Sequence, residues 1–145
     1  MNYIFLKIKK NNSCEMIKYE ASGCTFVLLG NFQPAIFQPK WLATKGLFSE
    51  SDADDAEIFA ISKNLSVFSV ASIRIECLDN KLVIGTPDES RFEVARDLVI
   101  GLISLLPDMI IEKLGINFDA QITDSSKEID FDLSTAVLKK KLAYE

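Results

Sequence analysis

Alternating apolar and polar residues in the middle of the chain predict a β-hairpin. Its two arms, residues 72–78 and 81–86, are joined by Asp79-Asn80, a pair that tolerates the positive φ angles of a tight turn. With these two residues as the loop, the pairs predicted to lie opposite each other on the apolar side are Cys77 with Leu82 and Ile75 with Ile84. One face of the hairpin is therefore expected to cover a core.

A spacing of three and four residues follows the hairpin and predicts one long helix over residues 87–106. Thr86 is a suitable N-cap, and Pro87 fits the first helical position because its missing N–H has no partner there. Glu89 completes a capping box, and Pro107 ends the pattern. The apolar stripe consists of Phe92, Ala95, Leu98, Val99, Leu102 and Leu106. Because apolar residues surround the second half of the helix, we expect that half to be buried on most sides.

Shorter strands and helices are predicted around these two elements. Strand patterns lie at residues 3–9, 15–19, 24–29, 65–70, 116–122 and 128–133. Turns are expected at 21–23 and 109–114, and short helices at 40–46, 51–61 and 134–143, the first of them ended by Gly46. The predicted fold class is α+β: a mainly antiparallel sheet of about five to seven strands, with the long helix packed on one face, in a single domain over residues 1–145.

The composition adds a surplus of apolar residues to this picture. Hydrophobic residues make up 48% of the 145-residue chain, and ten of them are Phe. This is a large share for a domain in which one helix covers one sheet. We therefore expect part of the apolar surface to serve self-association, as a homodimer, or a protein partner.

The charge and the cysteines narrow the class of partner. A formal net charge of −5 disfavours direct nucleic-acid binding and adsorption to an anionic membrane. The first residues lack the basic start of a secretory signal, and no apolar run approaches the about 18 residues of a membrane span. Three widely spaced cysteines, Cys14, Cys24 and Cys77, fit reduced thiols better than a disulfide framework. The expected location is the cytoplasm.

The absence of histidine removes most of the familiar catalytic chemistry. Neither a Ser-His-Asp or Cys-His centre, nor a His-ligated zinc, nor an imidazole base can form in this chain. The six glycines do not form a phosphate-binding fingerprint. We therefore predict no catalytic residue, no metal site and no cofactor.

Carboxylates are the one chemistry that remains open. Asp130 and Asp132 lie two residues apart on a predicted strand, and they could share a divalent cation with Asp119. The competing interpretation is that these acids form the solvent face of an edge strand. A magnesium-dependent carboxylate enzyme is thus kept as a second alternative function.

The segment between Gly30 and Gly46 carries the candidate partner-binding residues. The sequence Phe-Gln-Pro occurs twice there, and each proline excludes an ordinary central strand. The aromatic and apolar anchors that such a loop would present are Phe32, Ile36, Phe37 and Trp41. The alternative is that these side chains form a lid on the core, which is the commoner place for large aromatic residues.

An acidic patch follows at the start of the predicted helix over 51–61. Its members are Glu50, Asp52, Asp54, Asp55 and Glu57. Carboxylates at this position complement the helix dipole, which explains them without a ligand. An EF-hand is excluded, because its loop would require a glycine where Glu57 stands and a glutamate where Lys63 stands.

Together these patterns predict a non-catalytic cytoplasmic protein that acts through protein–protein contacts, with itself or with another protein. The first alternative is an acidic inhibitor of the phage or mobile-element type, in which the acidic patch imitates the phosphates of a nucleic acid.

Overall fold

The structure is a computed structural model that describes residues 3–10, 13–120 and 137–139. The chain divides into two compact units, one of residues 1–22 with 119–145 and a larger one of Gly23–Phe118. Two long strands, β2 (Ser13–Gly30) and β7 (Ile111–Ala120), run through the boundaries of both units. The predicted single domain over residues 1–145 stays a prediction, and the two units are described separately.

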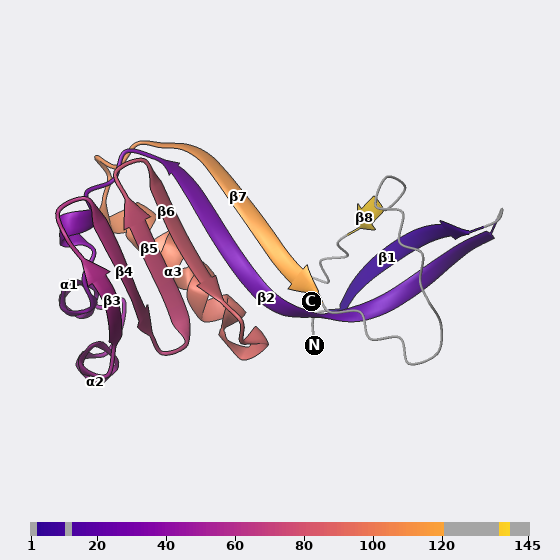
Figure 1. Cartoon of the computed structure of the whole chain (residues 1–145), viewed down its shortest axis with the longest axis horizontal. Helices are drawn as coiled ribbons and strands as arrows, with labels where there is room; N and C mark the ends of the chain where they lie inside the picture. The colour runs from indigo at the N-terminus through magenta and orange to yellow at the C-terminus, as the bar shows by residue number, and fades with distance from the viewer. Residues whose placement is uncertain (1–2, 11–12, 121–136, 140–145) are drawn as a thin grey trace. The chain divides into compact units, whose positions relative to one another are not determined.

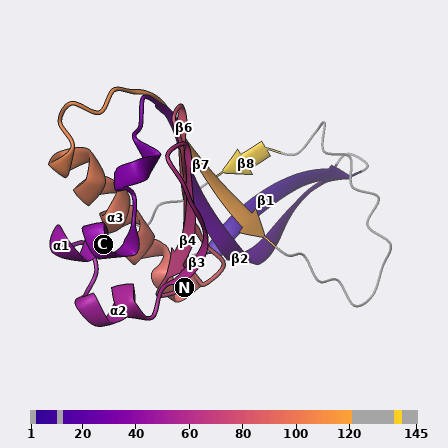
Figure 2. The ribbon, with the colours of Figure 1, turned by 60° about the vertical axis from the view of Figure 1, so that its left-hand side comes forward.

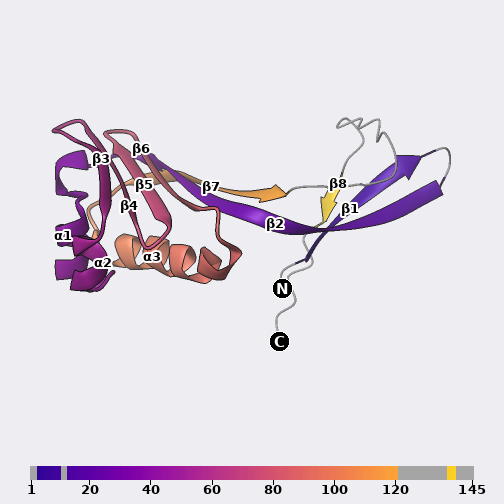
Figure 3. The same ribbon diagram turned by 60° about the horizontal axis from the view of Figure 1, so that its bottom comes forward.

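The larger unit is built on a six-stranded antiparallel sheet in the order β3-β4-β5-β6-β2-β7 (Figure 1). Its remaining strands are β3 (Glu57–Ile61), β4 (Leu65–Val70), β5 (Ile73–Leu78) and β6 (Lys81–Thr86). The helices are α1 (Pro39–Thr44), α2 (Glu50–Asp54) and α3 (Phe92–Leu105), with 3₁₀ turns at Pro34–Ile36 and Glu89–Arg91. All three helices lie on the same face of the sheet (Figures 2 and 3). The predicted α+β class is confirmed.

The central hairpin has the predicted register. Cys77 lies opposite Leu82 and Ile75 opposite Ile84, with Asp79 and Asn80 as the loop. The carbonyls of these two loop residues also accept hydrogen bonds from the chain that leaves β2: Gly30 N–H donates to Asn80 O at 3.2 Å and Phe32 N–H to Asp79 O at 2.8 Å. The loop therefore holds the end of β2 as well as its own two strands.

The core lies between the sheet and the helices. Strand residues that alternate towards the helices are buried, as the pattern predicts. They include Phe26 and Leu28 of β2, Phe68 and Val70 of β4, Ile73 and Ile75 of β5 and Leu82 and Ile84 of β6. Ser66 is the polar exception on β4, and its buried hydroxyl donates a hydrogen bond to the carbonyl of Phe37. Because this buried hydroxyl has a partner, the hydrogen bond stabilises one position of the segment around Phe37 on β4.

Helix α3 begins later than the sequence predicts. The pattern places Thr86 at the N-cap, but Thr86 remains in β6 opposite Cys24, so its backbone belongs to the sheet. Asp88 caps the 3₁₀ turn instead, since its carboxylate accepts hydrogen bonds from the Ser90 N–H at 2.9 Å and hydroxyl at 2.7 Å. These two donors lower the pKa of Asp88. The α-helix itself starts at Phe92.

Helices α1 and α2 are both shorter than predicted, and the second prediction is largely wrong. Gly46, at φ 72°, ends α1 in a Schellman arrangement, with its N–H on Ala43 O at 2.8 Å. Ser49 caps α2 by accepting from the Asp52 N–H at 3.0 Å, as expected. The helix predicted to Ile61 stops at Asp54, because β3 pairs with the edge of β4.

Pairing partners far away in the sequence also change the strand boundaries. The turn predicted at 21–23 is wrong, because β2 continues through these residues. The turn predicted at 109–114 is wrong beyond residue 110, because β7 pairs with β2 and begins at Ile111. A local pattern cannot predict either boundary, since both depend on pairing with a strand that is distant in the sequence.

The smaller unit holds a hairpin and a short third strand. Strand β1 (Tyr3–Lys10) pairs with β2 as predicted, with Ile4 opposite Tyr19 and Ile8 opposite Glu15. Strand β8 (Val137–Lys139) pairs with the other side of β1, so the helix predicted over 134–143 is wrong at these three residues. The predicted strand at 128–133 lies outside the described residues.

Candidate interaction surface

Catalytic and metal-binding groups do not converge in the described residues. Within residues 3–10, 13–120 and 137–139, no three His, Cys, Asp or Glu side chains approach closely enough to hold a metal ion. Asp119 is exposed on β7, and the other two members of the carboxylate hypothesis, Asp130 and Asp132, lie outside the described residues. The magnesium hypothesis therefore stays a prediction.

Cys77 has the properties of a core residue. Its side chain is fully buried, and its thiol donates weakly to the Leu78 carbonyl at 3.7 Å. Burial, together with the nearby carboxylate of Asp79, raises the pKa of Cys77 from 9.0 to about 12. A thiol with this pKa stays protonated at neutral pH and is a poor nucleophile.

The pKa of Cys77 predicts a loss of stability in alkaline solution. Between pH 9 and about pH 12 the thiol ionises in the unfolded chain but not in the folded one, so the free energy of unfolding falls as the pH rises. Urea unfolding at about pH 8 and about pH 10.5 measures this fall. A Cys77→Ala variant serves as the control and is expected to show a smaller fall between the two pH values. An equal fall in both proteins would contradict the assignment.

The aromatic segment is divided between core and surface. Phe32 and Phe37 are 3% and 1% exposed, whereas Ile36 and Trp41 are partly exposed. The rings of Phe37 and Trp41 lie 5.7 Å apart, centre to centre. Between this segment and the end of α3 there is an open hollow of about 290 Å³, near the low end for small-molecule sites. Partner binding by these four residues stays a prediction, and only Ile36 and Trp41 offer surface for it.

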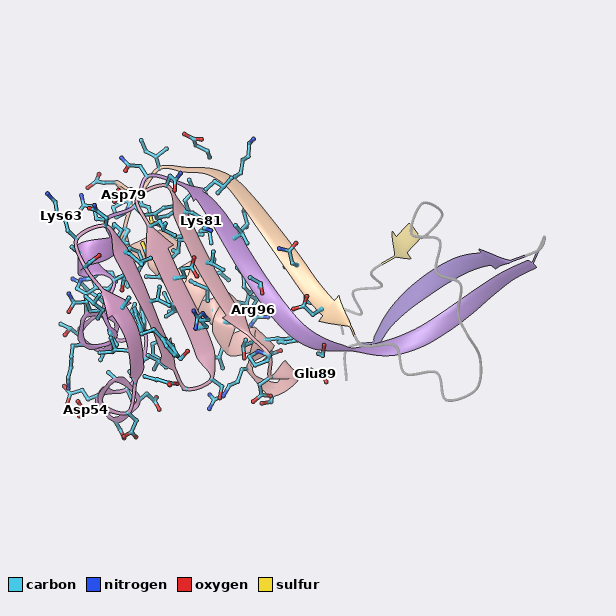
Figure 4. All side chains as sticks on the ribbon, in the orientation of Figure 1. Asp54, Lys63, Asp79, Lys81, Glu89 and Arg96 are labelled. Atoms are coloured by element: carbon cyan, nitrogen blue, oxygen red, sulfur yellow. The ribbon has the colours of Figure 1, made fainter. Side chains whose placement is uncertain are left out.

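The acidic patch is partly neutralised by its own neighbours. Asp54 forms an ion pair with Lys40 of α1, and Asp52 accepts a hydrogen bond from the Ser49 hydroxyl at 2.7 Å. Glu50, Asp55 and Glu57 are exposed. Asp54 lies at the opposite end of the sheet from Lys63 and Asp79 (Figure 4). The imitation of nucleic acid by this patch stays a prediction.

Exposed apolar side chains are the most pronounced surface feature. Eleven large apolar residues of the described part are exposed, and seven of them lie between Val94 and Ile116, on α3, on β7 and on the link between the two. The seven are Val94, Ile100, Ile103, Leu105, Ile110, Leu114 and Ile116. The expectation that the second half of α3 is buried on most sides is wrong, because Ile100, Ile103 and Leu105 are exposed.

On β7, one side chain fixes which way the others point. The ring of Phe118 lies edge-on to Phe92 of α3, with 6.1 Å between ring centres, so Phe118 points to the helix-covered face. Because successive strand residues alternate, Leu114 and Ile116 point to the same face. They are 51% and 49% exposed, so nothing in the described part covers half of their surface.

On α3, a contact on the opposite flank orients the exposed residues. A Cβ atom at Gly101 would lie 2.6 Å from the Leu47 side chain, so this flank faces the link between α1 and α2. Ile103 is two residues further and therefore lies about 200° around the helix, on the flank away from Leu47. Ile100, three residues before Ile103, lies next to it on the surface of the helix and is also exposed. We call Ile100, Ile103, Leu114 and Ile116 the α3–β7 strip.

Exposed apolar residues also lie on β3, the opposite edge of the sheet, but that edge is protected. Strand β3 exposes Ile58 and Phe59, but its pairing with β4 shifts between Ile58 and Ala60, which is a bulge. The guanidinium of Arg74 lies 4.8 Å from the centre of the Phe59 ring, so this ring has a partner inside the unit. A short, bulged edge strand is a common protection against edge-to-edge pairing.

The α3–β7 strip does not follow from the sequence alone. The available signal was the surplus of hydrophobic residues, together with the apolar residues on every side of α3 beyond Leu98. By itself this signal predicts burial, because neither the position of β7 nor the limited contact of α3 with the sheet follows from local periodicity.

Comparisons with known families, curated proteins and solved structures gave no match. None of the helices in the described residues has both the length and the apolar character needed to cross a bilayer.

Proposed function

We propose that this protein is a non-catalytic cytoplasmic binding protein whose α3–β7 strip contacts another polypeptide. The observation that carries this proposal is the concentration of exposed apolar side chains on α3 and β7. Patches of this kind are uncommon on monomers and are typical of protein-binding surfaces.

The chemistry around the strip supports a protein rather than a small molecule as the ligand. Its four members are aliphatic, and charged groups lie at its margin: Arg96 and Asp97 of α3, which form an ion pair at 2.8 Å, and Glu112 of β7. An apolar centre with a polar rim is the usual anatomy of a protein interface. The cytoplasmic location is supported by Cys77, a buried thiol that takes no part in a disulfide.

The test is affinity capture from a lysate of the source cells, with Ile100→Asp beside the wild type. Ile58→Asp on β3 is the matched control, because Ile58 and Ile100 are 57% and 55% exposed. A charge in the centre of an apolar interface is costly, so we expect the Ile100 variant to lose at least about tenfold in affinity for the captured polypeptide. Both variants must keep the wild-type melting temperature. Equal capture by all three proteins would contradict the proposal.

A further inference from the structure

We infer that β7 pairs, edge to edge and antiparallel, with β7 of a second copy of this chain, with Ile116 on the two-fold axis. This inference rests on the proposed function and names the polypeptide that covers the β7 members of the α3–β7 strip, Leu114 and Ile116.

The first step is the state of the β7 edge. In the described residues β7 pairs with β2 alone, so its other edge presents backbone N–H and C=O groups. The strand is ten residues long and contains no proline. Residues 112–117 are all exposed. A long edge strand of this kind is a template for pairing with another chain, in contrast to the five-residue bulged β3.

The second step is the register that a two-fold axis allows. An antiparallel pair of identical strands has its axis perpendicular to the sheet, and residues directly opposite each other share a face. The axis must therefore pass opposite a single residue, which pairs with its own copy. With Ile116 at the axis, the opposite pairs are Ile116 with Ile116, Gly115 with Asn117, Leu114 with Phe118 and Lys113 with Asp119.

The third step is complementarity in that register. The three central pairs on the helix-covered face are apolar, and they bring Leu114 and Ile116 of one copy against Ile116 and Phe118 of the other. Glu112 lies opposite Ala120 only at the two ends of the paired region. On the other face of the sheet, which carries no helix, Lys113 lies opposite Asp119 twice, once on each side of the axis. Both side chains are exposed, and neither forms an ion pair within the described part of its own chain. Opposite charges directly across a strand pair are favourable.

Neighbouring registers lose this match. An axis at Gly115 places Lys113 opposite Asn117, and an axis at Leu114 places Glu112 opposite the apolar Ile116. An axis at Lys113 sets two lysines against each other, which is unfavourable. An axis at Asn117 keeps apolar pairs on the helix-covered face but places Asp119 opposite Gly115. Among axes at residues 113–117, only Ile116 combines apolar pairs with pairs of opposite charge.

The test begins with sedimentation equilibrium of the full chain and disulfide trapping in a Cys14→Ser background. Opposite Cα atoms in an antiparallel pair lie about 4.5–5.5 Å apart, within reach of a disulfide. Ile116→Cys is therefore expected to give a covalent dimer under mild oxidation. Leu114→Cys is the matched control: two copies of Leu114 would be about 13 Å apart, four residues along the strand, and should not cross-link.

A charge exchange tests the same register without cysteines. Lys113→Glu is expected to raise the dissociation constant of the dimer about tenfold or more, because two like-charged pairs replace two opposite ones. Adding Asp119→Lys to that variant should restore the wild-type constant, which a merely destabilised fold would not do. Restoration, with the cross-link at Ile116, supports the inference.

A monomer at every concentration, or a dimer that cross-links through Leu114 and not Ile116, overturns the inference. The proposed function and the dimer can be contradicted independently of each other. A monomer that still captures a different polypeptide through Ile100 keeps the α3–β7 strip as a binding surface and removes only the second copy. A dimer trapped at Ile116 together with equal capture by the Ile100 variant removes the other partner and keeps the dimer.

Discussion

Replacing Gly30 by alanine is expected to destabilise the larger unit by about 3 kcal/mol or more, because the added methyl group meets backbone. An ideal Cβ at Gly30 would lie 1.9 Å from the carbonyl oxygen of Ile110 and 3.1 Å from the Cα of Ile111. Neither atom belongs to a flexible side chain, so β2 and the start of β7 would have to separate. Asn31 N–H also donates to Ile110 O at 3.0 Å, and this hydrogen bond would be disturbed by the same movement.

The control for this substitution is Gly115→Ala on β7. A Cβ at Gly115 would lie 3.9 Å from the Val27 carbonyl oxygen, an ordinary contact. Glycine weakens a strand interior, so this variant should have nearly wild-type or slightly higher stability. Urea unfolding of both variants and the wild type gives the comparison. Similar free energies of unfolding for the two variants would show that β2 and β7 do not approach as closely as the structure places them.

Truncation of Phe37 to alanine is expected to cost about 3–5 kcal/mol, the range for a fully buried phenylalanine. Phe37 is 1% exposed, its ring packs against Trp41, and its carbonyl accepts the hydrogen bond of buried Ser66. The substitution removes the ring and leaves a cavity beneath the loop. The fall in the free energy of unfolding, measured in urea, checks the value.

Ile36→Ala provides the comparison for Phe37, because Ile36 is next in the chain and only partly buried. We expect it to cost less than about 1.5 kcal/mol, since less apolar surface is removed from the core. This contrast also decides which substitutions can test partner binding by the loop. Variants of Ile36 and Trp41 are expected to preserve the fold, whereas loss of binding by a Phe37 variant would not distinguish a lost contact from unfolding. A mild effect of Phe37→Ala would place its ring outside the core.

The hairpin and the α+β class could be predicted because their signals are local. Asp79 and Asn80 set the register of β5 and β6 within a few residues, and Ile75 does face Ile84. The apolar stripe of α3 has an equally local signal, and Phe92, Ala95, Leu98, Val99 and Leu102 are buried as predicted. The sixth predicted member, Leu106, is half-buried just beyond the end of the helix. Where the sequence pattern and the tertiary pairing agree, local inference is sufficient.

The errors fall where a distant strand overrides a local signal. The acidic start of α2 suggested a long helix, but Glu57–Ile61 satisfies its backbone on β4. Val137–Lys139 similarly extends the hairpin of β1 and β2 in place of a helix. The candidate surface escaped prediction for the same reason. Its members come from α3 and β7, and only the paired sheet brings them to one face.

The Asp79-Asn80 loop has a consequence for engineering the chain. Tips of β-hairpins are usually good places for an inserted tag or a new terminus, because few contacts depend on them. Here the two loop carbonyls receive the N–H groups of Gly30 and Phe32, and an insertion that moves them would release the exit of β2 together with the hairpin. In the described residues, the turn at Ala71 and Ser72, between β4 and β5, accepts no such backbone hydrogen bond from another segment. It is the better of the two turns at which to open or lengthen this protein.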